Sequence, residues 1–232
     1  MQAQDSTTLF FYQLWSWIEI KRNKLIGGVI AIGAVALVAW FMVSQRAANE
    51  IAAGQALTKI ILSPSGQMSD AYMSVASQYA GTTAGKRAQV LGAAALFEAG
   101  KFPEAQAAFQ KYLDAHPDGD YIAQASLGVA KCLEAQGKTD LAAAAYQRLI
   151  NNSPDVAAVS NARFSLGQID ESLGRFSDAA NVYQDLVNNA QGTMLASEAA
   201  LRLVNLKGKI ETTKTTTAVP PAASKPPVKT GP

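Results

Sequence analysis

Cysteine and histidine are almost absent from this sequence, which has one of each among 232 residues. A single cysteine excludes a disulfide framework, and one cysteine with one histidine cannot supply a multi-cysteine zinc site or a histidine-rich metal site. Charge is scarce too, since 16% of the residues are charged and the net charge is +2. That balance gives no electrostatic footprint for binding nucleic acid.

Catalytic constellations are also missing. His116 stands alone in the loop HPDGD, where we expect a surface side chain, so no serine or cysteine nucleophile has a histidine base. We expect Cys132 to be a small buried side chain. We expect the carboxylate pair Asp170 and Glu171 to lie on a solvated face of a helix. No phosphate-binding glycine loop or calcium loop occurs. We therefore expect no enzyme, no cofactor, no metal and no small-molecule substrate.

Charge is distributed unevenly along the chain. Residues 1–46 carry four basic and two acidic side chains, and residues 47–211 carry 13 basic and 16 acidic ones. Residues 212–232 hold three lysines, no acid and five of the nine prolines. The central body is therefore mildly acidic. The last segment cannot form a core, and we expect a disordered tail with extended polyproline character.

Residues 25–43 form a run of 19 residues without a charge. As a helix this run would span about 28 Å, close to the hydrocarbon thickness of a bilayer. A buried core helix would normally keep a polar stripe, and a cleaved signal peptide would have a shorter apolar core than this one. We therefore predict a single transmembrane helix, with both alternatives kept open.

The charges beside the predicted span indicate its orientation. Lys21, Arg22 and Lys24 precede it, whereas Arg46 alone follows closely. The positive-inside rule then places residues 1–24 in the cytoplasm and the body on the other side of the membrane. The aromatic-rich stretch 9–20 predicts a short interfacial helix within that cytoplasmic segment.

An internal repeat of 37 residues occupies residues 47–211. One series of glycines, two series of alanines and one series of aromatic residues recur at this spacing. Each copy has two apolar segments with helical spacing, separated by a glycine that suits the end of the first helix. We expect Thr139 and Ser177 to cap second helices and Pro103 to lie in a first turn. The repeating positions are Gly100, Gly137 and Gly174; Ala105, Ala142 and Ala179; Ala88, Ala125, Ala162 and Ala199; and Tyr72, Phe109, Tyr146 and Tyr183.

Each copy is thus predicted to be a hairpin of two antiparallel helices. A lone hairpin cannot bury its apolar face, so neighbouring copies should stack into an all-α solenoid. Small residues at Ala56, Ala93, Ala130 and Gly167 should lie where the two helices of a hairpin cross. The repeated aromatic residues should pack in the core, in the gap toward the next hairpin. The predicted helix pairs are 47–62 and 69–80, 86–99 and 103–115, 121–136 and 139–151, and 155–173 and 177–189, with a final helix at 194–208.

The run LFEAGKFPEAQAAFQKYL with the later Pro117 resembles the tetratricopeptide repeat. The 37-residue spacing is similar to that of the periplasmic coordinator of cell division in the Tol-Pal system. The layout of the chain resembles the ancillary subunit of the Sec translocon, which has a short cytoplasmic segment, one span and periplasmic tetratricopeptide-like hairpins. These resemblances imply a membrane-anchored adaptor whose partners are a translocon complex, exported chains or periplasmic chaperones.

Protein binding is the function that the residues leave open. The outward positions of the first helices should line a concave surface, and an aromatic side chain beside mixed charges there suits a protein ligand. The candidate protein-binding residues are Phe97, Lys131, Glu134, Gln168 and Glu171. Two rival hypotheses remain: an envelope or cell-division coordinator that binds through the solenoid alone, and an envelope enzyme with an undetected site.

Overall fold

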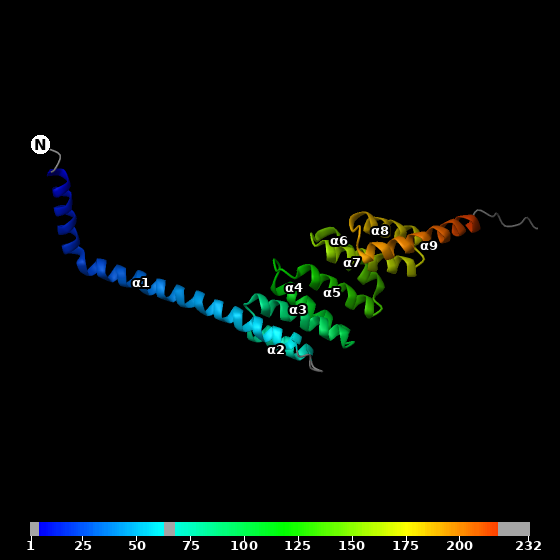
Figure 1. The fold of residues 1–232 in the computed structure, drawn as a ribbon, viewed down its shortest axis with the longest axis horizontal. Coiled ribbons are helices and arrows are strands. Elements are labelled where there is room, and N and C mark those ends of the chain that lie inside the picture. The colour runs from blue at the N-terminus through cyan, green and yellow to red at the C-terminus, as the bar shows by residue number, and fades with distance from the viewer. Residues whose placement is uncertain (1–4, 63–67, 218–232) are drawn as a thin grey trace, which may run out of the picture.

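The structure, a computed structural model, describes residues 5–62 and 68–217, with side chains at 33–62 and 68–211. All secondary structure in these ranges is helical (Figure 1). The helices are α1 (Asp5–Leu62), α2 (Met68–Gln78), α3 (Thr83–Glu98), α4 (Phe102–Ala115), α5 (Ile122–Ala135), α6 (Thr139–Asn152), α7 (Val156–Ser172), α8 (Phe176–Asn189) and α9 (Met194–Thr217).

Helix α1 is a single continuous helix where the sequence predicted an interfacial helix, a span and a first solenoid helix. It projects away from the solenoid as a long rod that bends near its N-terminal end (Figure 1). Its last turns, around Ala53 and Leu57, pack against α2 and α3. The solenoid therefore begins inside the same helix that carries the apolar stretch.

The predicted hairpins are confirmed as α3–α4, α5–α6 and α7–α8, each of which packs against the next. Gly100, Gly137 and Gly174 have φ values of 74°, 72° and 73°, in the left-handed region that glycine adopts without strain. After the first of these helices, the N–H of Lys101 donates to the carbonyl of Leu96 at 2.9 Å. This pattern satisfies carbonyls left over at the helix end.

The expected caps of the second helices are wrong. Thr139 is the first residue of α6, one position after Lys138 at the N-cap, and Ser177 lies inside α8. The second helices start so soon after the turn glycine that a long basic residue occupies the N-cap without a side-chain bond. Side-chain caps occur instead on first helices, at Thr82 of α3 and Asp155 of α7. Pro103 lies in the first turn of α4, as predicted.

The aromatic set forms the core, as predicted. Tyr72, Phe109, Tyr146 and Tyr183 are at most 8% exposed. The rings need close helix contacts, and helical glycines provide them. A Cβ added to Gly128 of α5 would lie 2.5 Å from the ring of Phe109, and one added to Gly167 would lie 2.5 Å from the ring of Tyr183. Each glycine therefore lets a neighbouring ring pack against the helix backbone.

Helix α9 ends the stack, and it is longer than predicted. Leu203 and Leu206 pack it onto α7 and α8, and it continues to Thr217. Residues 212–217, which we expected to be disordered, are helical because α9 carries on past its last packed turn. The rest of the expected tail, 218–232, lies outside the described residues.

Candidate functional site

The first helices of the hairpins line one face of the solenoid. Helices α1, α3, α5, α7 and α9 each contact the next in that series, whereas α2, α4, α6 and α8 make no comparable contacts with one another in the described ranges. Because the helices are closer together on one side, the stack curves toward that side. We call the surface formed there by α3, α5 and α7 the inner face.

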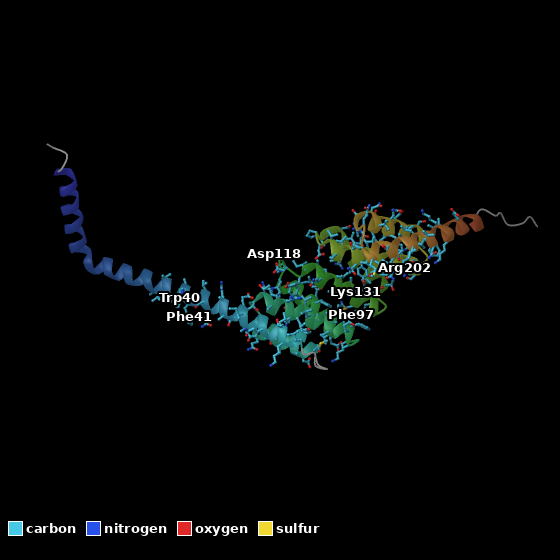
Figure 2. The ribbon with its side chains drawn as sticks, viewed as in Figure 1. Trp40, Phe41, Phe97, Asp118, Lys131 and Arg202 are labelled. Atoms are coloured by element: carbon cyan, nitrogen blue, oxygen red, sulfur yellow. The ribbon has the colours of Figure 1, made fainter. Side chains whose placement is uncertain are left out.

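All five predicted binding residues lie on the helices of the inner face, and all are half-buried. Phe97 lies on α3, Lys131 and Glu134 on α5, and Gln168 and Glu171 on α7. Figure 2 shows Phe97 and Lys131 on the solenoid side where Arg202 of α9 also lies. The 37-residue step thus brings the set to one surface, but it does not leave every member free.

Phe97 is more covered than an exposed anchor would be. It packs against the α3–α4–α5 core, and its ring centroid lies 5.2 Å from that of Phe102, across the hairpin turn. An aromatic pair at this separation favours a fixed geometry. Phe97 therefore presents a held, partly exposed apolar edge to the inner face.

The two glutamates are engaged by tyrosines of their own hairpins. The Tyr146 hydroxyl donates to Glu134 Oε2 at 2.6 Å, and the Tyr183 hydroxyl lies 3.5 Å from Glu171 Oε2. Burial and the Glu134 contact raise the pKa of Tyr146, so its hydroxyl stays protonated and keeps donating. In the α3–α4 hairpin, phenylalanine occupies both equivalent positions. Glu134 and Glu171 therefore join the two helices of a hairpin, a role that the sequence did not suggest.

Glu171 is also bound by α9. Arg202 reaches Glu171 Oε2 at 3.2 Å, and Lys209 reaches Oε1 at 3.4 Å. The Arg202 guanidinium additionally contacts Glu198 at 3.2 Å and lies 5.5 Å from the centre of the Phe164 ring. Arg202 was not among the predicted residues, although its spacing of four residues from Glu198 is typical of a helix-surface ion pair.

Lys131 and Gln168 differ from the glutamates. Neither side chain makes a hydrogen bond or ion pair within the ranges whose side chains are described, and both are half-buried. An ammonium and an amide held on a partly covered surface can donate to a carboxylate or a backbone carbonyl of a bound chain. Together with Phe97 on α3, the helix that contacts α5, they form the part of the inner face that is open to a ligand, which we call the open patch.

Asp170 and Glu171 are not a solvated pair, contrary to expectation. Asp170 is 6% exposed, and Arg175 of the following turn donates to its Oδ1 at 2.6 Å. Glu171 is satisfied by Tyr183 and α9. Both carboxylates are thus occupied in joining helices.

The remaining candidates for chemistry have structural surroundings. His116 ends α4 with its ring 4.8 Å from that of Tyr112, so it is half-buried against a tyrosine and not a free surface residue. Cys132 is buried, as predicted, and burial raises the pKa of its thiol to about 11. The described side chains contain no cluster of histidine, cysteine, aspartate and glutamate that could hold a metal ion.

A second concave region lies away from the inner face. It is a hollow of about 650 Å³ between α4 and α6, with α5 as its floor. The hollow exists because the second helices do not touch each other. Its lining mixes apolar side chains such as Leu113, Ile122 and Val129 with Gln110 and Arg148, and it contains none of the predicted binding residues.

The predicted span lies partly outside the side chains that the structure describes, which begin at residue 33. Within the described part of the chain, no helix is both long enough and apolar enough to cross a membrane. The apolar side chains that are described before the solenoid include Val35, Trp40 and Phe41, each more than half exposed. Figure 2 shows Trp40 and Phe41 on the rod of α1, away from the solenoid.

Comparison with known proteins agrees with the repeat architecture. The family model of the tetratricopeptide repeat matches residues 91–157, from the middle of α3 to the start of α7. A comparison with curated proteins gives no match. The matched segment holds the second half of α3 and all of α4, α5 and α6. Residues 91–157 therefore carry tetratricopeptide repeats, and such repeats imply a scaffold for protein–protein interaction.

Proposed function

We propose that this protein is a membrane-anchored periplasmic adaptor that holds protein partners on the inner face of its solenoid. The observation that carries the binding part is the open patch of the inner face. There Lys131 on α5 and Gln168 on α7 have polar groups with no partner within the described side chains, and α5 contacts α3, which carries the partly exposed Phe97. A chain that offers an apolar side chain and a carboxylate or carbonyl would satisfy all three residues.

The proposed anchor is the charge-free run 25–43, with the N-terminus in the cytoplasm. Its support is the length of the run, the basic residues before it and the exposed apolar side chains along α1. In water, exposed apolar side chains in such a number would be unfavourable. A lipid environment would remove that cost.

The proposed partners follow from the resemblance in layout to the ancillary subunit of the Sec translocon. On this proposal the anchor contacts the translocon, the inner face receives exported chains or periplasmic chaperones, and the protein catalyses no reaction. The first test is affinity purification from detergent-solubilised membranes with the full chain and with residues 47–232. Recovery of translocon subunits with the full chain alone supports the anchored adaptor. Recovery of the same soluble envelope proteins with both forms, without translocon subunits, supports the coordinator hypothesis instead.

A second test addresses the inner face. Lys131→Glu should reduce recovery of the soluble partners, because it reverses the charge of the open patch. Lys111→Glu, at an exposed position on α4, is the matched control, since it makes the same charge change on a second helix. Equal losses with both variants would show that net charge, and not the inner face, governs binding.

A further inference from the structure

One face of α1 is exposed along the part of the helix that belongs to the solenoid. Ala53 and Leu57 are buried against α2 and α3. On the opposite side of the same turns, Ile51 is 64% exposed and Leu62 is 77% exposed. A surface helix of a globular protein normally turns polar side chains to solvent. The two exposed apolar residues therefore need an explanation beyond the packing of this chain.

These residues belong to a longer stripe with regular spacing. The stripe alternates steps of four and three residues, which is the 3.5-residue period of a two-stranded coiled coil. Every member is exposed, and the stripe lies directly opposite the packed side of α1. We call it the outer stripe; it consists of Leu37, Phe41, Ser44, Ala48, Ile51, Gln55, Thr58 and Leu62.

Gly54 is a second, independent observation on this side of the helix. It lies in the interior of α1, where glycine lowers helix stability, and a Cβ added there would meet nothing within 4 Å. Packing within the chain therefore gives no reason for a glycine at this position, in contrast to Gly128 and Gly167. Gly54 also borders an open hollow on α1 together with Ile51, Gln55 and Thr58. A hollow beside a helical glycine permits close approach of another helix.

We propose that a second copy of this chain covers the outer stripe, so that two α1 helices form a parallel two-stranded coiled coil. The stripe suits its own copy. Gln55 has an exposed side chain with both a donor and an acceptor, so it can hydrogen-bond to the same residue across a two-fold axis. In a coiled coil along this stripe, the flanking positions between residues 44 and 62 would be 45, 47, 52, 54, 59 and 61. Lys59 is the one charged residue among them, so rows of like charges do not line the contact.

The geometry of the chain also permits this pairing. Both solenoids would lie on the outsides of the pair, because each packs on the side of α1 opposite the stripe. Neither inner face would be covered. The parallel direction follows if both chains are anchored in one membrane, and on this point the inference rests on the proposed anchor.

Cysteine cross-linking of the full chain in native membranes tests the proposal. In a Cys132→Ala background, single cysteines are placed on the stripe as Ser44→Cys and Thr58→Cys. Arg46→Cys and Asn49→Cys are the controls, because both are exposed and lie on the other side of α1. Equivalent residues of a parallel pair are close enough for a disulfide at the stripe and too far apart at the controls. We expect the two stripe variants to give several-fold more cross-linked dimer than the controls.

Three results would overturn the proposal. Equal cross-linking at stripe and control positions would indicate random collision in the membrane. No cross-linking at either stripe position would mean that the copies are not paired. A product heavier than the chain but different from twice its mass would show that another protein covers the stripe.

A second variant separates dimer formation from folding. Ile51→Glu with Thr58→Glu brings like charges together across the two-fold axis, at positions that are exposed in the single chain. We expect unchanged helix content by circular dichroism, and light scattering of the protein–detergent complex should change from the mass of two chains to that of one. Asn49→Glu should keep two. A double variant that remains dimeric refutes the coiled coil. Partner capture on the inner face is measured separately, so either proposal can fail alone.

Discussion

Gly167→Ala should destabilise this protein, although the same change in an exposed helix is stabilising. Alanine exceeds glycine in helix propensity by about 1 kcal/mol. At position 167, however, the new methyl group would lie 2.5 Å from a ring carbon of Tyr183, whose side chain is fully buried. Overpacking of a well-filled core costs about 1–3 kcal/mol. The steric cost therefore outweighs the gain in propensity, and we expect a net loss of about 1 kcal/mol in the free energy of unfolding.

The assay is urea unfolding followed by circular dichroism on the full chain in detergent, with Gly208→Ala as the matched control. Both glycines lie inside helices, but a methyl group at position 208 of α9 meets nothing within 4 Å. Gly208→Ala should therefore raise the free energy of unfolding by about 0.5–1 kcal/mol. If Gly167→Ala raises the midpoint as Gly208→Ala does, the packing of Tyr183 against the α7 backbone is wrong.

Three further outcomes follow from the contacts described above. Arg202→Ala should lower the free energy of unfolding by about 1 kcal/mol, because Glu171 loses a hydrogen-bonded partner from α9. Arg148→Ala, on the exposed side of α6, is the control and should have little effect in the same urea assay. Burial, followed by the charges of Arg202 and Glu171 with opposing effects, sets the pKa of Tyr183 at about 12. The unfolded tyrosine ionises near pH 10, so Tyr183 contributes its full stability below that pH, and this contribution is lost as pH rises toward 12. Tyr183→Phe should therefore reduce the loss of unfolding free energy between pH 10 and pH 12. An unchanged dependence of unfolding free energy on pH would contradict this assignment. Cys132 should react with a thiol reagent only as the protein unfolds, and rapid reaction in buffer at neutral pH would mean that α5 is not packed as described.

The repeat made most of the solenoid predictable from sequence. A residue type that recurs every 37 positions identifies a structural position, so Tyr146 and Tyr183 could be assigned to the core before any coordinates. Gly100 and its two equivalents likewise fixed where each hairpin turns, because few other residues adopt positive φ without strain. Helix lengths were predicted poorly at the two ends, where α1 and α9 are longer than expected and each has a neighbouring hairpin on one side alone.

The candidate site was harder to predict. The spacing gives Lys131 and Gln168 equivalent positions on α5 and α7, since it determines which side of a helix a residue occupies. It could not show that Tyr146 reaches Glu134, because that contact depends on the crossing of two helices and on a side-chain rotamer. Arg202 was missed for a related reason: the repeat has no equivalent of an arginine that binds the preceding first helix.

The continuity of α1 has a consequence for how the protein would work at a membrane. A helix without a break is stiff in rotation about its axis as well as along its length. Each residue inserted between Val43 and Glu50 would raise the solenoid by about 1.5 Å and turn its inner face by about 100° around the rod. Seven inserted residues would restore the direction of that face to within about 20° at a greater height. Height and direction are therefore coupled in one helix: seven inserted residues change the height almost alone, whereas a single residue mainly changes the direction.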